Sequence, residues 1–442
     1  MANVSGGVQI ETKRKHELSI PFQSVTGDQS LNVGTLLMQF IGFIVYDTQF
    51  WLNILFGLLV AAPFAFTLHK TTKDRLVRFA MFVYIAVYIF PYFVVQSWAD
   101  HDVNWKILAI HSLFFVIVLT FSNFAIRLFR PNINSLPNAG EQEIAEKSVS
   151  LNILFDVLFW LLACFWFIYF LLYPEHSGFF TYFGLNNTPS HPRFSFYDAN
   201  DAVQGAYVLF LRIVALLAIL SASSRSRHQL FIVVIVSALI ALQSVERQNL
   251  IVLVFVLFVI SIARRKPFEY KESYFVLLLS LILAIVMQGN VEIESDDNLL
   301  SASMGIVFVR IIADLFYMSS FLFETYDGNL LFGSTSRIFD YVDLGLDYAV
   351  GWSAIGLMPD LYLNFGYFGY IFGAVYYSIL LTIAASLLAK AQGFFIQIIS
   401  FILYLIALIG LFYSNTFSLV PAFIFMLATS MLVIQRGGRF AK

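Results

Sequence analysis

The chain has 442 residues, of which 59% are hydrophobic and only 12% are charged. Soluble domains carry about a quarter of their residues as charged side chains. This composition, with a mean hydropathy of +0.79, therefore excludes an ordinary soluble fold and predicts a polytopic membrane protein. The net charge of −2 gives no sign of a nucleic-acid partner. Cys164, the only cysteine, lies inside an apolar run, which excludes a disulfide framework and a CxxC metal site.

The apolar segments predict an all-α membrane protein with about 12 spans. A hydrocarbon core of about 30 Å requires about 20 helical residues, and the runs at 33–47, 230–244 and 250–263 are shorter. If residues 33–47 lie in the membrane interface, eleven spans remain and the polar leader, residues 1–32, is outside. Residues 33–442 are predicted to form one transmembrane domain. The runs are 33–47, 50–68, 79–98, 105–126, 151–173, 203–221, 230–244, 250–263, 273–288, 362–388, 394–414 and 416–434.

The distribution of Lys and Arg predicts the orientation of these spans. Cytoplasmic loops of membrane proteins are enriched in basic residues, and with a cytoplasmic leader 20 of the 26 Lys and Arg residues fall on that side. The opposite side then has two long external loops, 174–202 and 289–360. The cytoplasmic set is Lys13, Arg14, Lys15, Lys70, Lys73, Arg75, Arg78, Arg127, Arg130, Lys147, Arg225, Arg227, Arg264, Arg265, Lys266, Lys271, Lys390, Arg436, Arg439 and Lys442.

The six remaining basic residues lie in spans or on the outer side, where this rule makes them rare. They are Lys106, Arg193, Arg212, Arg247, Arg310 and Arg337. A guanidinium at membrane depth costs about 3 kcal/mol on insertion scales, and its fork of donors matches phosphate oxygens. We therefore predict an outward-facing cavity in which the last four of these arginines bind the anionic group of a lipid-attached substrate. Lys106 and Arg193 are typical of surface charges.

Each of the four arginines also fits a purely structural role. Arg212, within VLFLRIVALL, fits an internal ion pair, and Arg247, in the turn QSVERQN, fits a pair with the preceding glutamate. Arg310 and Asp314 are four residues apart in SMGIVFVRIIADLFYMSSF, which has the pattern of a helix on the outer leaflet. That spacing also fits an intrahelical salt bridge. Arg337 follows the turn-rich GNLLFGSTSR, where a surface position is equally compatible.

The external loop 174–202 contains His176 and His191 among several aromatic residues. Two histidines 15 positions apart, without a third positioned ligand, do not indicate a metal site. His191 fits a general base or a sugar contact. The aromatic side chains fit either stacking on sugar rings or an interfacial belt.

The segment GWSAIGLMPDLYLNFGYFGYIFG leads from the large external loop into the span at 362–388. It has Gly366, Gly369 and Gly373 at the start of that span, where small residues allow helices to approach closely. Asp360 and Asn364 directly precede these glycines.

This segment belongs to an order of features that resembles a known family. The hairpin at Arg247, the helix with Arg310, the FG turn at 332–333 and the glycine-rich segment follow one another over roughly residues 203–390. The order resembles the O-antigen and capsule repeat-unit polymerases (the Wzy class), relatives of the O-antigen ligases. Both belong to the lipid-linked-sugar glycosyltransferases, so the resemblance implies a GT-C-like fold.

The resemblance implies roles for particular residues. Arg247 and Arg310 would grip undecaprenyl diphosphate. In the ligases a histidine shortly before the Gly-x-x-Gly helix takes the acceptor proton, whereas residues 351–364 contain no histidine. This departure disfavours a ligase and leaves the base of a polymerase open. Asp360 is the nearest carboxylate, and it fits equally well as the N-cap of a helix that begins at Leu361.

The implied reaction is glycosyl transfer from a chain on undecaprenyl diphosphate to a sugar hydroxyl of another lipid-linked repeat unit, at the outer face of the bacterial inner membrane. Arginines stabilise the developing charge without a metal or cofactor, and a carboxylate or histidine assists deprotonation. The expected partners are undecaprenyl-diphosphate-linked oligosaccharides, membrane lipids, a chain-length regulator and a flippase of the same pathway.

Other membrane classes remain as alternatives. A lipid-linked oligosaccharide flippase or another secondary transporter also has about 12 spans, but such proteins usually contain an internal repeat, and the sequence shows none. An O-antigen ligase is close in chemistry and lacks its histidine here. A membrane-bound acyltransferase needs a histidine within or beside a span, and only His111 qualifies.

Overall fold

The computed structural model is all-helical over the part of the chain that it describes, as the sequence predicts. No strand occurs in that part. Five of its helices are long and apolar enough to cross a membrane, namely Leu52–Thr71, Trp105–Arg127, Ile153–Leu172, Asp201–Ser223 and Leu357–Leu388. The count of 12 spans stays a prediction, and the leader 1–32 and the runs at 33–47 and 416–434 lie outside the described residues. These are 48–93, 105–134, 141–185, 195–245, 247–263, 270–292, 316, 319, 323, 356–390 and 394–411.

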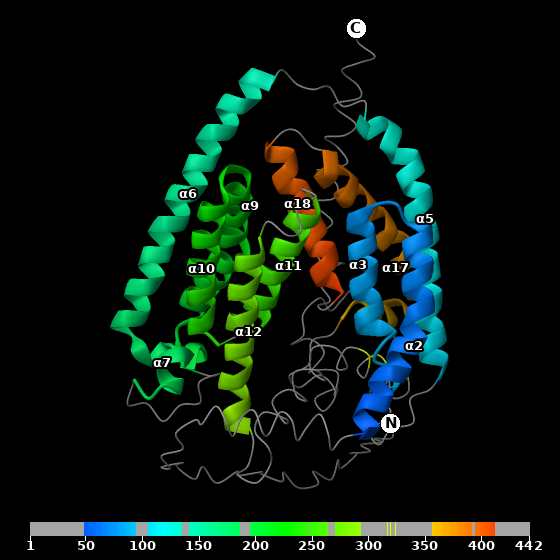
Figure 1. Ribbon diagram of the computed structural model, residues 1–442, viewed down its shortest axis with the longest axis horizontal. Coiled ribbons are helices and arrows are strands. Elements are labelled where there is room, and N and C mark those ends of the chain that lie inside the picture. The colour runs from blue at the N-terminus through cyan, green and yellow to red at the C-terminus, as the bar shows by residue number, and fades with distance from the viewer. Residues whose placement is uncertain are drawn as a thin grey trace, which may run out of the picture.

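The helices form two groups (Figure 1). The first combines the N-terminal helices with the C-terminal pair that returns to them, and consists of α2 (Thr48–Thr71), α3 (Arg75–Tyr88), α5 (Trp105–Asn134), α17 (Leu357–Lys390) and α18 (Phe394–Gly410). The second consists of α6 (Glu141–Leu172), α8 (Asp201–Leu209), α9 (Ala215–Arg225), α10 (Arg227–Gln243), α11 (Arg247–Ala263) and α12 (Lys271–Glu292). Where α3 meets α11, the ring of Phe79 stacks on that of Phe258 at a centroid distance of 5.8 Å.

Several predicted boundaries differ from the helices observed. The run at 79–98 does not form one long helix, because α3 begins at Arg75, capped by the Asp74 side chain, and ends at Tyr88. Pro91 follows three residues later, and a proline lacks the N–H that a helix needs and restricts the residue before it. The predicted limits of this span are therefore wrong.

The two short runs in the middle of the chain form the short helices α10 and α11. Each is 17 residues long, about 26 Å at 1.5 Å per residue, and so slightly shorter than a hydrocarbon core of about 30 Å. Short elements fill the described parts of the external loop 174–202, namely η1 (Pro174–His176), α7 (Gly178–Tyr182) and η2 (Ser195–Asp198).

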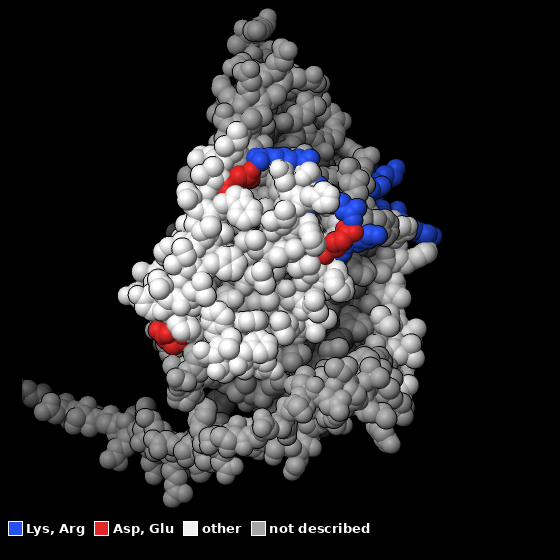
Figure 2. All heavy atoms as spheres, turned by 60° about the vertical axis from the view of Figure 1, so that its left-hand side comes forward, with Lys and Arg blue, Asp and Glu red and all other residues white. Residues whose placement is uncertain are grey.

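Basic side chains gather at one end of the bundle, which we call the basic end (Figure 2). There α2 ends and α3, α10 and α12 begin. The described basic residues of these helix ends and of the end of α9 are Lys70, Lys73, Arg75, Arg78, Arg225, Arg227 and Lys271. All belong to the set that the sequence assigns to the cytoplasm, so the opposite end of the bundle corresponds to the predicted outer side.

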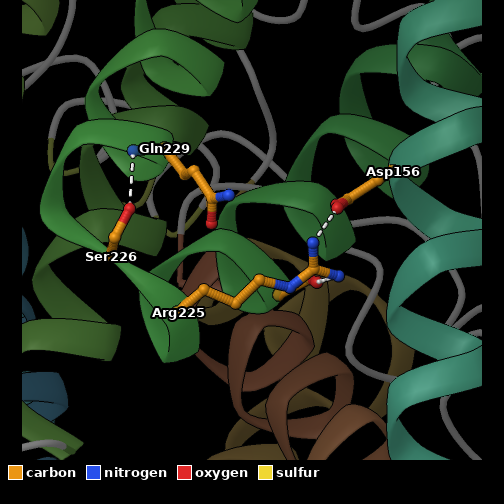
Figure 3. A network of polar contacts seen from close by, with 5 residues as sticks. Asp156, Arg225, Ser226 and Gln229 are labelled. Atoms are coloured by element: carbon orange, nitrogen blue, oxygen red, sulfur yellow. Dashed lines mark hydrogen bonds and ion pairs between the residues drawn. The ribbon is translucent and has the colours of Figure 1, made fainter.

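Ion pairs between neighbouring helices satisfy several of these charges. Arg225 of α9 pairs with Asp156 of α6 (Figure 3), and Arg227 of α10 pairs with Glu272 of α12, with 3.1 Å between Nε and Oε2. The hydrogen bond from Arg227 lowers the pKa of Glu272 below its ordinary value. Ser226, between the two arginines, caps α10 by accepting a backbone N–H at 3.1 Å.

The lateral surface of the bundle, between its two ends, is apolar. Leu161, Leu171 and Leu172 of α6 are 65%, 70% and 68% exposed, and the face below the basic residues in Figure 2 is almost free of charge. Soluble proteins rarely expose large contiguous apolar patches. Lipid is therefore the expected neighbour of this surface.

Buried tyrosines connect the helices of the first group. The Tyr404 hydroxyl of α18 donates to the carbonyl of Leu76 in α3 at 2.6 Å, and the Tyr377 hydroxyl of α17 donates to the carbonyl of Ala407 at 3.1 Å. A polar group in a membrane interior has no water to bond with, so these bonds hold α17 and α18 against the N-terminal helices.

Helix α17 is broken near its start. Gly366 has φ 59° and ψ −146°, close to a region of backbone conformation that is essentially restricted to glycine. The chain folds back there, because a Cβ at Gly369 would lie 2.3 Å from the carbonyl oxygen of Leu361, and one at Gly373 would lie 2.4 Å from the Leu361 side chain. The turns before Gly366 thus lie directly against those that follow.

Gly369→Ala is expected to destabilise the protein, because its Cβ would collide with the Leu361 backbone. Overpacking of this kind costs roughly 1–3 kcal/mol. Gly205→Ala in α8 is the matched control, since its Cβ would meet no atom within 4 Å and alanine favours a helix by about 0.5–1 kcal/mol. Thermal unfolding in detergent should show a lower Tm for Gly369→Ala and an equal or higher Tm for the control. Equal Tm values for both variants would contradict the folded-back arrangement.

Candidate functional site

Asp360 and Asn364 are buried polar side chains in the first turns of α17, with exposed fractions of 3% and 5%. The Asn364 Nδ2 donates to the backbone oxygen of Asp360 at 2.9 Å and to its Oδ1 at 3.0 Å. Because α17 begins at Leu357, Asp360 lies inside the first turn. The alternative that it caps a helix starting at Leu361 is therefore wrong.

Tyr88, the last residue of α3, connects this turn to the N-terminal helices. Its hydroxyl donates to the carbonyl of Leu411 at 2.6 Å and lies within hydrogen-bonding reach of the backbone of Leu357 and Met358. Asp360 is close enough to interact electrostatically with the same hydroxyl. The start of α17 is thus fixed against the end of α3, at the end of the bundle opposite the basic end.

His111 of α5 lies beside Tyr88, with 5.1 Å between the two ring centroids. Its side chain is buried, and neither ring nitrogen has a hydrogen-bond partner among the described residues. The Tyr84 hydroxyl donates to the backbone carbonyl of His111 at 3.1 Å. We call Tyr88, His111, Asp360 and Asn364 the polar cluster.

Three positions of the large external loop are described, and one of them contacts the polar cluster. Phe316, Ser319 and Phe323 are helical, and their spacing puts them on one side of a helix. The Phe316 ring lies 5.4 Å from that of His111, and the Phe323 ring lies 5.0 Å from that of Tyr362 in α17. Phe316 of the external loop therefore packs against the polar cluster, and Phe323 packs against the first turns of α17.

Arg212 lies in a different part of the bundle. It belongs to a π-helical turn, η3 (Phe210–Val214), between α8 and α9, a type of irregularity that often occurs at functional sites. Its side chain is half-buried, and its Nε has no hydrogen-bond partner among the described residues. The turn packs against α6 and α11 of the second group, whereas Asp360 belongs to the first. No described contact brings the two side chains together.

Arg247 is the first residue of α11, at the same end of the bundle as the polar cluster. The hairpin before it is strained, because Val245 has φ 55°, which is a genuine outlier for a β-branched residue. Gln243 fixes this hairpin by accepting a hydrogen bond from the Ser177 hydroxyl at 2.7 Å. The predicted pair between Arg247 and Glu246 involves atoms outside the described ones.

The remaining predicted site residues, His191, Arg310 and Arg337, lie outside the described residues. Gly366 and Gly369, predicted near the site, lie at the break of α17 and at the contact that follows it, where Gly369 packs against Leu361, the neighbour of Asp360. Within the described ranges, no three His, Cys, Asp or Glu side chains are grouped so that they would hold a metal ion. The described histidine of the outer loop, His176, has its Nδ1 2.6 Å from the Tyr169 hydroxyl.

Sequence reasoning did not select Tyr88 and His111 as site residues. His111 carries one signal, since it is the histidine that lies within a predicted span. Tyr88 carries none, because tyrosines are frequent in the spans and its neighbours come from distant segments.

Comparisons with models of protein families, with curated proteins and with solved structures find no match to this chain.

Proposed function

We propose that this chain is a polymerase of the bacterial inner membrane that joins oligosaccharide repeat units carried on undecaprenyl diphosphate into an O-antigen or capsule. It would act as a metal-independent glycosyltransferase with a GT-C-like organisation, on the outer face of the membrane. The observation that carries the proposal is a buried carboxylate, Asp360, held by Asn364 at the end of an apolar bundle opposite its basic end.

In the proposed reaction, Asp360 takes the proton of the acceptor hydroxyl. The oxygen of this hydroxyl then bonds to the anomeric carbon of the donor sugar, and the bond from that carbon to the diphosphate breaks, with the electron pair leaving on the diphosphate. The burial of Asp360 supports this role, because it keeps bulk water from competing with the acceptor hydroxyl for the carboxylate.

The position of Arg247 supports diphosphate binding. A cation at a helix N-terminus is disfavoured by about 0.3–1 kcal/mol, so an arginine that begins α11 gains nothing from the helix itself. An anion bound there would gain from both the guanidinium and the free N–H groups of the first turn. In the proposal Arg310, Arg337 and Arg212 complete the contacts to the diphosphate. A chain-length regulator and a flippase would act in the same pathway.

A transporter of the same lipids is the second candidate. The break at Gly366 favours it, because transporters often bind their substrates where membrane helices are discontinuous. A polymerase forms longer chains in detergent solution. A transporter produces no change there, because there is no membrane across which to move its substrate. An O-antigen ligase would instead move finished chains to a different lipid acceptor.

Asp360→Asn should reduce turnover at least about 100-fold, the usual contribution of a general base, while binding of lipid-linked substrate falls much less. Asparagine keeps the size and the hydrogen bond with Asn364 but accepts no proton. Initial rates and substrate retention of the purified variant measure the two effects. A rate near that of the wild type would reduce Asp360 to a structural role.

Arg247→Ala and Arg310→Ala are expected to abolish long polymer while the protein stays inserted and abundant, because each removes a diphosphate contact. Arg227→Ala is the matched control, since this arginine pairs with Glu272 at the basic end. Polymer length in cells and protein amount in membranes are the measurements. Long chains in both outer variants would exclude the diphosphate contacts.

The direct test is to incubate the purified protein with a single lipid-linked repeat unit and separate the products on a gel. A ladder of chain lengths is expected, and EDTA should leave it intact because arginines, not a metal ion, neutralise the leaving group. If the ladder depends strictly on an added divalent ion, the metal-independent mechanism is wrong. If no ladder forms, the polymerase proposal fails.

A further inference from the structure

His111 is a buried side chain whose hydrogen-bonding capacity is unused. It is 1% exposed, and neither Nδ1 nor Nε2 has a partner among the described residues. A neutral imidazole has one donor and one acceptor nitrogen. In folded proteins the large majority of buried polar side-chain atoms have a hydrogen-bond partner. A phenylalanine would fill the same space among aromatic rings without burying unpaired nitrogens. The imidazole is therefore free, among the described residues, to bond a molecule that binds beside it.

His111 lies near the end of α5 that corresponds to the predicted outer side. It lies six residues after Trp105, where α5 begins, which corresponds to about 9 Å of helix. Tyr88, at the end of α3, lies on one side of the ring, and Phe316 of the external loop contacts it as well. Phe316 also lies 6.0 Å from the ring of Tyr92, so this loop side chain packs between His111 and the residues that follow α3.

The surroundings of His111 distinguish between classes of ligand. A metal ion needs three or four protein ligands, and no such group occurs among the described residues. A phosphate needs cationic partners, whereas the described rings that contact His111, those of Tyr88 and Phe316, are neutral. A hydroxyl donates one hydrogen bond and accepts others, which matches a neutral imidazole.

We propose that His111 binds a hydroxyl group of the acceptor sugar at a position that Phe316 covers in this structure. The sugar ring would take the place of the Phe316 ring between the external loop and His111, and the reacting hydroxyl would lie beside Tyr88, within hydrogen-bonding reach of Asp360. This inference rests on the proposed function and names the binding site of its acceptor. The donor diphosphate would bind elsewhere, at Arg247.

Three variants test the assignment. His111→Phe keeps the ring packing but removes both nitrogens, His111→Gln keeps one donor and one acceptor, and His228→Phe, at an exposed position of the basic end, is the control. Each purified protein is incubated with lipid-linked repeat units extracted from the source cells. The ladder and the Tm in detergent are then measured on the same samples.

The proposal predicts opposite effects on activity and stability. His111→Phe should lower the rate of ladder formation about tenfold or more, the effect of losing one hydrogen bond to the substrate, and mainly through a higher KM. Its Tm should equal or exceed that of the wild type, because an unpaired polar group is removed from the core. His111→Gln should recover part of the rate, and His228→Phe should match the wild type.

Two outcomes overturn this inference but leave the proposed function standing. An unchanged ladder in His111→Phe, with a normal wild-type ladder, shows that the imidazole does not contact substrate. A loss of rate that follows a loss of Tm, without recovery in His111→Gln, shows that the imidazole is structural. If the wild type forms no ladder, the proposed function fails and this inference fails with it.

Discussion

A polar group inside a membrane must find its hydrogen-bond partners within the protein, and this constraint determines which parts of the bundle are rigid. The hydroxyls of Tyr404 and Tyr377 meet it by donating to carbonyls of neighbouring helices. Asp360 meets it through Asn364, four residues later, whose Nδ2 donates to Oδ1, and the break at Gly366 then folds the neighbouring Leu361 back against Gly369. A continuous helix could not bring its own first turns against its later ones.

Backbone irregularities occur near the residues that carry charge in apolar surroundings. Gly366 has a positive φ close to Asp360, Val245 has a positive φ two residues before Arg247, and a π-helical turn contains Arg212. The conformation of Val245 costs of order 1–3 kcal/mol and the π-helical turn disturbs regular packing, whereas glycine adopts the Gly366 conformation without that strain. Folded proteins retain strain of this kind where it directs a side chain to a place that a regular helix would not reach. The three irregularities therefore support functional roles for Asp360, Arg247 and Arg212.

The sequence predicts the helices well and their contacts poorly. Hydrophobic runs locate helices because burial in lipid depends on local composition, and this holds even for the short α10 and α11. It fails for α3, where Pro91 ends a run that remains apolar. Asp360 was found from its place before a glycine-rich segment. His111 becomes a candidate site residue only through its contacts with Tyr88 and Phe316, which are more than 20 and 200 residues away in the sequence. No local sequence pattern encodes such contacts.

The described polar side chains at the two ends of the bundle differ in whether they have partners within the protein. This difference supports a ligand site beside His111. At the basic end, Arg225 and Arg227 are paired with carboxylates of neighbouring helices. Such exposed pairs contribute little to stability, but they leave these charges with partners already in place. At the opposite end, His111 is buried with both nitrogens unused, although a buried unpaired group costs about 1–3 kcal/mol. A hydroxyl bound beside His111 would give this imidazole the partner that Arg225 and Arg227 already have.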